Sequence, residues 1–528
     1  MTPRPHLGRS AGLVVPLFSL RSGRDWGIGD IGDLPPFAGW LSSGGFRVLQ
    51  LLPTNTLAEG ETSPYSALSA MAIDPVYVAV DEVPEFPGFG GEARLPLGAQ
   101  AALRTARSGS RVRYAHVREA KESALRLCFS LFWDVDWVRT TPRAGAFAAY
   151  ASWEDWWLGD YALFCALRGR FGGRPWREWP EPIRLRDRDA LEAASRELAD
   201  EILYHQFVQW VADDQWSRAR DAMGDVHLFG DFPFMVGADS ADVWANQHLF
   251  RFDATVGTPP DAFSATGQDW GLPVYRWDRM HAEDDRWLRQ RARRAARLYD
   301  GVRLDHLVGF YRTYSRTTGS TTGGLDPPDE PEQLRQGERL MALFAESGLQ
   351  LTAEDLGSVP DFVRLSLGRL KIPGYKVLRW EREWDVPGEP FRSPARYPPT
   401  SVATTGTHDT EPLVTWWSEA PAEERLAFAR LIENRPELRG NDVAELPFTP
   451  ELRDILLELL YTSGSDLLLL PIQDVFGWSE RINIPATVGA DNWTWRLPLT
   501  SAELADHPEA RARTAFLHRL ASESGRLS

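Results

Sequence analysis

Short apolar, β-branched runs recur along the chain, and segments with helical spacing of apolar residues separate most of them. Residues 12–20 form the first run and residues 46–52 the second. Between them, a helix-like pattern begins after Asp33, a residue type that caps helix N-termini, and ends at Gly44-Gly45. The order strand, helix, strand predicts the opening of a parallel α/β fold.

The regular alternation stops after the second run. Residues 58–223 show no repeating strand and helix pattern, and helical periodicity dominates residues 97–170 and 187–223. Loops at the carboxyl ends of the strands carry the active sites of β/α barrels. We therefore expect residues 58–223 to form a mostly helical insertion that shapes a substrate groove.

The alternation resumes at about residue 224 and continues almost to the end of the chain. A basic helix is expected at residues 283–299, and further helices at 331–347 and 360–370. Additional strands are predicted at residues 226–234, 301–308, 350–356, 374–380, 401–408 and 466–472. With the first two runs, these strands predict a (β/α)8 TIM barrel with large, mostly helical insertions between barrel strands.

This pattern divides the chain into three parts. Residues 1–57 begin the barrel, residues 58–223 form the insertion, and residues 224–528 complete the barrel. The last part includes a polar, lid-like loop at about residues 237–281 and a helix near the C-terminus. Residues 315–324 are rich in Ser, Thr and Gly and are expected to form a mobile loop. Too little chain follows the last strand for a C-terminal β-sandwich domain, so none is expected.

Three carboxylates lie at or just after the ends of predicted strands. They are Asp305, Glu354 and Asp409. Strand alternation places Arg303 on the same face as Asp305, where it would keep that carboxylate ionised and oriented. Glycoside chemistry needs one carboxylate to attack the sugar and one carboxylic acid to protonate the leaving oxygen.

Each of these motifs also has a purely structural explanation. Arg303 and Asp305 could form an ordinary ion pair, and Glu354 could be a loop or helix-cap carboxylate. His408 and Asp409 could belong to a turn. Taken one at a time, the motifs therefore leave the structural and the catalytic interpretations open.

Composition argues against several other classes of function. Lys and Arg number 58 and Asp and Glu number 74, and the resulting formal charge of −16 disfavours nucleic acid as a partner. No apolar run is long enough to span a membrane, so we expect a cytoplasmic protein with no membrane partner. The 22 tryptophans suit sugar binding, because sugar rings stack on aromatic faces, although most are expected in the core.

No cofactor or metal ion is expected. A Gly-X-Gly-X-X-Gly motif occurs at residues 27–32, but the acidic residue that a dinucleotide site needs about twenty residues later is missing. The sequence lacks a P-loop motif, and its His, Cys and carboxylate residues lack the spacing of a metal site. Cys128 and Cys165 are interpreted as buried thiols rather than a disulfide.

The motifs taken together resemble those of glycoside hydrolase family 77, the 4-α-glucanotransferases of the amylomaltase or disproportionating-enzyme type in the α-amylase clan. The segments RLDH at 303–306, AEDLG at 353–357 and TGTHD at 405–409 are similar to the nucleophile, acid/base and third-carboxylate motifs of that family. Further similar segments are GIGD at 27–30, SPY at 63–65, GDFP at 230–233, PPD at 259–261, TGQDWG at 266–271, PIQD at 471–474 and NWTWR at 492–496.

The resemblance implies a retaining double displacement on α-1,4-linked glucans. Asp305 would be the nucleophile, Glu354 the acid and then the base, and Asp409 a carboxylate that holds hydroxyls of the reacting sugar. The implied substrate-binding residues are Arg303, His408, Tyr65, Asp231, Asp261, Gln268, Trp270 and Asn483. The resemblance implies maltooligosaccharide partners and no cofactor, and we expect a monomer or a weak homodimer.

The sequence departs from the family pattern at a few positions near these motifs. Thr410, Glu411 and Pro412 follow Asp409, where the family usually has Asn first, and Ala262 replaces a common Tyr. None of these departures removes one of the three carboxylates. They leave acceptor preference and the contacts of the lid open.

The sequence leaves two other functions open. A hydrolase on the same scaffold, an α-amylase or α-glucosidase, would use the same carboxylates, because water and a sugar hydroxyl compete for one intermediate. A non-catalytic glucan-binding protein would not need all three carboxylates, and their presence argues against it. Product analysis separates transfer from hydrolysis, since transfer yields longer dextrins and hydrolysis yields a steady rise in reducing ends.

Overall fold

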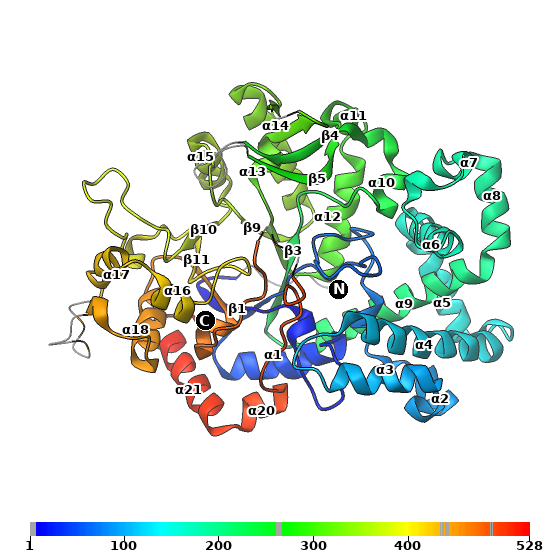
Figure 1. The fold of residues 1–528 in the computed structure, drawn as a ribbon, viewed down its shortest axis with the longest axis horizontal. Helices are drawn as coiled ribbons and strands as arrows, with labels where there is room; N and C mark the ends of the chain where they lie inside the picture. The colour runs from blue at the N-terminus through cyan, green and yellow to red at the C-terminus, as the bar shows by residue number, and fades with distance from the viewer. Residues whose placement is uncertain are drawn as a thin grey trace.

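The computed structural model describes residues 7–527, except residues 260–266, 321, 433–434, 436–437, 439–442, 486 and 488. Parallel strands close into a barrel at the centre of the molecule, in the order β1-β12-β11-β10-β9-β6-β3-β2 (Figure 1). They are β1 (Ser10–Val14), β2 (Val48–Gln50), β3 (His227–Phe232), β6 (Gly301–Leu304), β9 (Gln350–Ala353), β10 (Gly374–Val377), β11 (Ser401–Thr404) and β12 (Leu467–Pro471). Each barrel strand overlaps one predicted strand, so the (β/α)8 TIM barrel is confirmed.

The barrel strands are buried on both faces, which explains why their sequences are almost continuously apolar. In β12, Leu467 and Leu469 join the cluster that fills the barrel, whereas Leu468 and Leu470 pack in the larger core with the surrounding helices. The other buried members of the filling cluster are Val14, Val48, Phe229, Tyr375 and Val402. The barrel interior is therefore a packed core rather than a pore.

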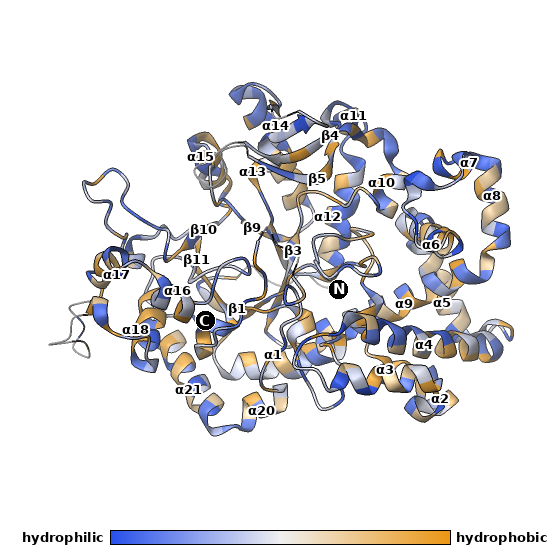
Figure 2. Cartoon of the chain, in the orientation of Figure 1, coloured by the Kyte–Doolittle hydropathy of each residue, from blue (hydrophilic) through white to orange (hydrophobic). Residues whose placement is uncertain are grey.

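Helices between the strands cover the outside of the barrel, and Figure 2 shows apolar and polar positions alternating around them. They include α1 (Leu34–Ser43), α12 (Arg286–Leu298), α14 (Glu330–Glu346), α15 (Asp361–Leu370), α16 (Leu413–Glu419), α17 (Ala422–Ala429) and α18 (Pro450–Tyr461). Two more helices, α20 (Ser501–Asp506) and α21 (Pro508–Glu523), follow the last strand. The helices predicted at 283–299, 331–347 and 360–370 are confirmed as α12, α14 and α15. No helix among the described residues is long and apolar enough to cross a membrane.

Most of residues 58–223 forms a helical lobe on one side of the barrel (Figure 1). Its helices are α2 (Glu85–Phe89), α3 (Leu97–Arg107), α4 (Tyr114–Phe132), α5 (Pro142–Trp153), α6 (Asp155–Arg170), α7 (Glu181–Arg184), α8 (Arg188–Glu197) and α9 (Ala199–Ala222). The last of them, α9, returns to the barrel wall. There Nε1 of Trp216 donates to the carbonyl of Leu298 (2.7 Å), and Asp213 pairs with Arg294 of α12 (2.7 Å). The lobe and the barrel thus share one continuous hydrophobic core.

A second sheet was not predicted, and the expectation of a loop throughout residues 237–281 is wrong. Strands β4 (Phe250–Thr258) and β5 (Gln268–Tyr275) lie in that segment and pair with each other in an antiparallel hairpin. On its other edge β4 pairs with β7 (Thr313–Thr317), which pairs in turn with β8 (Gly323–Asp326). The described part of the expected loop at 315–324 therefore also contains strand residues. Strand propensity depends strongly on packing context, and β4 also needs the more distant β7 as a partner, so the local sequence pattern was not sufficient to predict these strands.

Candidate active site

The barrel places Asp305 and Glu354 side by side at the carboxyl ends of neighbouring strands. Asp305 directly follows β6, and its N–H donates to the carbonyl of Phe232 at 3.1 Å. Glu354 directly follows β9, and its N–H donates to the carbonyl of Leu304 at 3.0 Å. The sheet hydrogen bonds thus extend one residue beyond each strand and fix the backbone of both carboxylates.

Arg303 is the positive charge at the centre of the site. Its Nη1 donates to both carboxylate oxygens of Asp231 (2.9 and 2.8 Å) and to Oδ1 of Asp305 (2.9 Å). The side chains of Arg303 and Asp231 are buried, whereas that of Asp305 is 25% exposed. Burial alone would lower the pKa of Arg303, but the two carboxylates raise it well above its usual value. The same-face prediction for Arg303 and Asp305 is therefore confirmed in space.

Glu354 lies in surroundings that favour its protonated form. The pKa of Glu354 is raised to about 8, chiefly because the carboxyl group is buried; Arg303 opposes this rise and the nearby Asp305 carboxylate adds to it. The main-chain N–H of His306 donates to Oε2 of Glu354 at 2.9 Å and favours the ionised form. A carboxyl group with a pKa near neutrality can give up a proton and take it back.

The third carboxylate is held by a histidine and an amide. Asp409 lies 3.3 Å from Nε2 of His408, and its Oδ1 accepts a 2.6 Å hydrogen bond from Asn483. Burial opposes ionisation of Asp409, but His408 and Asn483 hold the pKa of this carboxyl well below its usual value. Burial would lower the pKa of His408, yet Asp409 raises it. The carboxylate is therefore ionised while its side chain stays 44% exposed.

Tyr65 connects the buried charges to the third carboxylate. Its hydroxyl donates to Oδ2 of Asp231 at 2.7 Å and lies 3.2 Å from Nε2 of His408. The rings of Tyr65 and His408 stack with centroids 5.4 Å apart. Tyr65 comes from the first loop of the lobe, so that lobe reaches the end of the barrel that carries the carboxylates.

The second sheet brings two further predicted residues toward this site. Trp270 of β5 meets the ring of His306 edge-on, with centroids 4.7 Å apart. Its Nε1 donates to Oε1 of Gln268 at 3.1 Å, and Gln268 is exposed. Asp261 and Ala262 lie outside the described residues.

Comparisons with known proteins identify the family of the chain. A sequence model of glycoside hydrolase family 77, described as 4-alpha-glucanotransferase, matches residues 15–500. The chain belongs to this family. The predicted family is thereby confirmed, and the chain is an enzyme of the 4-alpha-glucanotransferase class.

Relatives of this family 77 glucanotransferase match it over almost their whole length. The 4-alpha-glucanotransferase of Thermus thermophilus is 33% identical over 527 residues, covering 96% of this chain and 98% of the relative. The 4-alpha-glucanotransferase of Chlamydia caviae is 31% identical over 529 residues, covering 96% and 93%. Amylomaltase from Streptococcus agalactiae, solved in complex with acarbose, superposes with a TM-score of 0.81 at 28% identity, covering 98% and 99%.

Two residues that contact the candidate site residues were not themselves predicted as site residues. His306 adopts a φ of +45°, in the left-handed region, and this turns its N–H toward Glu354. Trp493 packs its ring 5.8 Å from that of Tyr65 and 5.7 Å from that of His408. The place of His306 within the RLDH segment was a usable signal, whereas Trp493 reaches the site through folding of the chain beyond β12.

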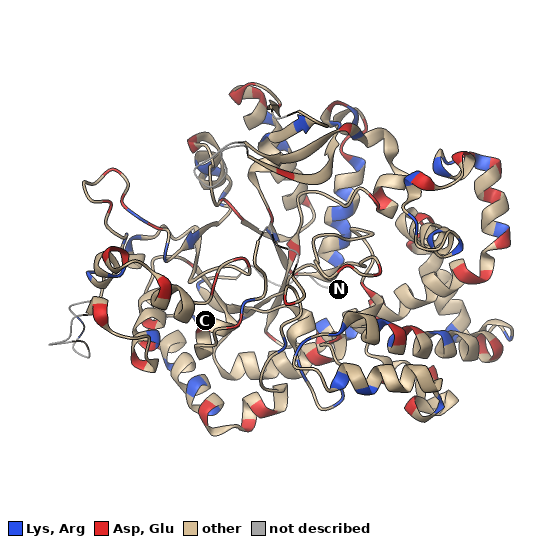
Figure 3. Cartoon of the chain, in the orientation of Figure 1, with Lys and Arg blue, Asp and Glu red and all other residues tan. Residues whose placement is uncertain are grey.

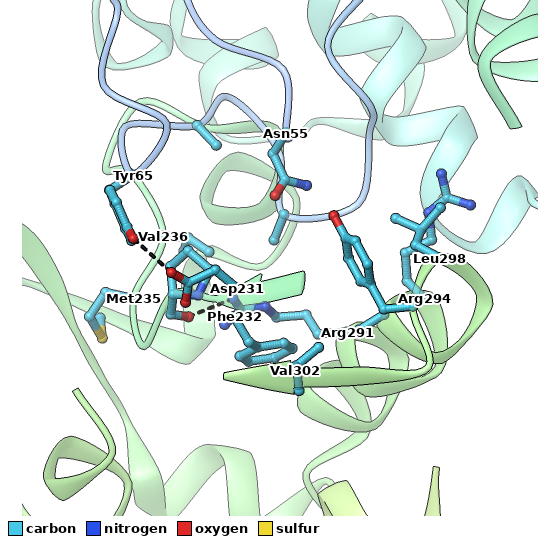
Figure 4. Close-up of a pocket in the computed structure, with 15 residues that line it drawn as sticks. Asn55, Tyr65, Asp231, Phe232, Met235, Val236, Arg291, Arg294, Leu298 and Val302 are labelled. Atoms are coloured by element: carbon cyan, nitrogen blue, oxygen red, sulfur yellow. Dashed lines mark hydrogen bonds between the residues drawn. The ribbon is translucent and has the colours of Figure 1, made fainter. Parts of the chain in front are cut away.

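A small cavity of about 30 Å³ lies behind Asp231, between the barrel and α12 (Figure 4). Its polar lining includes Asn55, Tyr299 and two arginines of α12, Arg291 and Arg294. Figure 3 shows the run of basic positions along this helix. The volume suits a single water molecule among polar groups. Among the described residues, no group of three or more His, Cys, Asp or Glu side chains could hold a metal ion.

Proposed function

We propose that the protein moves α-1,4-glucan segments from a donor maltodextrin to the 4-hydroxyl of an acceptor glucan through a covalent glycosyl-Asp305 intermediate. One observation carries the proposal. Asp305 is bound by Arg303 at 2.9 Å, while the neighbouring carboxyl, Glu354, has a pKa of about 8. One group is prepared to attack as an anion and the other to donate a proton, as retaining glycoside chemistry requires.

The first step breaks the donor. A carboxylate oxygen of Asp305 attacks C1 of a donor glucose as the bond from C1 to the glycosidic oxygen breaks. Glu354 gives its proton to that oxygen, and the freed glucan leaves with a new 4-hydroxyl. Arg303 pairs with Asp305 and fixes the direction of its carboxylate, which a nucleophile needs.

The second step builds the product. The 4-hydroxyl of an acceptor glucan attacks C1 and releases the carboxylate of Asp305. Glu354, now ionised, takes the hydroxyl proton and returns to its starting state. Two inversions at C1 restore the α configuration. Water in place of the acceptor gives hydrolysis by the same route.

We assign Asp409 and His408 to hydroxyl groups of the reacting sugar. The transition state carries positive charge on the ring, and hydrogen bonds from its hydroxyls to an ionised carboxylate strengthen as that charge develops. The support for this role is the ionised, partly exposed state of Asp409 beside His408 and Asn483. Tyr65 fixes His408 by stacking.

The groove for the rest of the glucan is assigned to the helical lobe and the second sheet. Trp270 and Gln268 on β5 are proposed contacts on one side, and Tyr65 on the other. Asp261, which lies outside the described residues, is proposed as a contact from the sequence alone. Asp231 is buried under Arg303 and Tyr65, so we assign it first to holding these residues and only through them to the sugar.

Incubation with maltotriose tests the proposed function. The wild-type enzyme should give glucose and a ladder of longer maltodextrins on chromatography, and Glu354→Gln and Asp305→Asn should give neither. Glucose and maltose without longer products would make the protein a hydrolase. No turnover with retained binding of acarbose would leave glucan binding as the function.

A further inference from the structure

Residues 407–410 form a tight turn that is closed by hydrogen bonds between Thr407 and Thr410. The hydroxyl of Thr410 donates to the carbonyl of Thr407 at 3.0 Å and accepts from the N–H of Thr407 at 3.0 Å. A Cβ added at Gly406 would lie 2.4 Å from this hydroxyl. Thr410 and Glu411 are two of the positions at which the sequence departs from the family pattern, so part of that departure lies in the turn that carries the third carboxylate.

Glu411 lies between two arginines from other segments. Nη1 of Arg379, from the chain after β10, donates to Oε1 of Glu411 at 2.6 Å. Nη1 of Arg481, from the chain beyond β12, lies 3.7 Å from Oε2 of Glu411. The Arg379 side chain is 2% exposed and that of Glu411 29%, so this carboxylate compensates a buried cation.

Arg481 also contacts the segment that holds the third carboxylate, and so links it to Glu411. Its Nη2 donates to the main-chain carbonyl of Asp409 at 2.7 Å, and its Nε donates to the carbonyl of Asn483 at 3.2 Å. Asn483 in turn donates to Oδ1 of Asp409. Arg481 therefore fixes both the backbone of Asp409 and the amide that directs its carboxylate.

We propose that Glu411 is a positioning residue for glucan transfer, which holds Arg481 in place so that Arg481 and Asn483 aim the carboxylate of Asp409 at the reacting sugar. This rests on the proposed function and adds a residue to it that touches no substrate. The turn that Thr410 stabilises places Glu411 between Arg379 and Arg481. When a group that acts in the transition state is displaced slightly, the rate of the reaction falls more than the affinity for substrate does.

The test compares Glu411→Ala with Glu411→Gln, Arg481→Met and the double variant, using maltotriose as donor and acceptor. Glu383→Ala is the matched control, because Glu383 pairs with Arg396 in the loop before β11. Thermal unfolding shows that each variant is folded. If Glu411→Ala does not fold, Glu411→Gln carries the test, because it keeps the size of the side chain and removes its charge.

We expect kcat of Glu411→Ala to fall about 10-fold with KM changed less than about 3-fold. Glu411→Gln should lie between it and the wild type. In the Arg481→Met background, Glu411→Ala should add less than about a 2-fold loss, because both substitutions break one connection. Additive losses, a change confined to KM, or a rate like that of Glu383→Ala would overturn the inference. The proposed function would fail independently of this inference if the wild type made no dextrins longer than maltotriose.

Discussion

The main-chain N–H of His306 donates a 2.9 Å hydrogen bond to Oε2 of Glu354. The residue after the proposed nucleophile thus holds the proposed acid/base, and this hydrogen bond links the positions of the two carboxylates. The bond depends on a left-handed backbone at His306, with φ of +45°. A substitution there changes the site through the backbone as well as through the lost ring.

Substitutions at His306 should separate these two effects. Glycine adopts the left-handed region without strain, whereas a β-branched residue strongly disfavours it. We expect His306→Val to lose the N–H contact that favours ionised Glu354, so the alkaline limb of kcat/KM for maltotriose moves to higher pH. His306→Gly should keep the wild-type limb, although its rate falls because the contact with Trp270 is gone. Equal limbs in both variants would contradict the role of this hydrogen bond.

The pH dependence of the first step should follow Glu354. Because the pKa of Glu354 is about 8 and the step needs its proton, kcat/KM for maltotriose should fall as pH rises through about 8. An α-maltosyl fluoride donor needs no proton on its leaving group, so consumption of this donor should lack that alkaline fall. An identical fall with both donors would assign the limb to another group.

The raised pKa of Glu354 also predicts a pH-dependent stability. The folded protein binds this proton more tightly than the unfolded chain, so the contribution of Glu354 is complete below pH about 4.5 and is lost as pH rises to about 8. Glu354→Gln lacks this loss. We therefore compare the free energy of unfolding of Glu354→Gln with that of the wild type at two pH values. The variant minus wild-type difference should be more favourable to the variant at pH 8.5 than at pH 5 by about 1 kcal/mol or more. Melting temperatures at both pH values test this, and a constant difference would contradict it.

Removing the charge of Arg303 should destabilise the fold unless the charge of the Asp231 carboxylate is removed with it. Arg303→Met leaves the buried carboxylate of Asp231 without its ion pair, and we expect a loss of about 3 kcal/mol or more in stability. Arg303→Met combined with Asp231→Asn should regain much of the melting temperature but none of the activity, because Asp305 still lacks its partner. Failure to regain stability would show that Arg303 supports the fold by other contacts.

The parts of the molecule that follow local rules could be predicted from sequence. The barrel strands are apolar on both faces, and alternation alone placed Arg303 beside Asp305. The pairing of β4 with β7 joins segments far apart in the chain, so the pattern at 237–281 looked like a loop. The contact of Trp493 with Tyr65 likewise depends on where distant loops meet at the barrel end.

Trapping the covalent intermediate tests the central claim most directly. Glu354→Gln incubated with α-maltosyl fluoride should still form the intermediate, because fluoride leaves without a proton from an acid. It should release the intermediate slowly, because the base of the second step is missing. Mass spectrometry of the digested protein should then find a maltosyl group on the peptide that contains Asp305, and none in Asp305→Asn carrying the same Glu354→Gln substitution. A maltosyl group on another residue, or turnover with an inverted product and no adduct, would contradict the account.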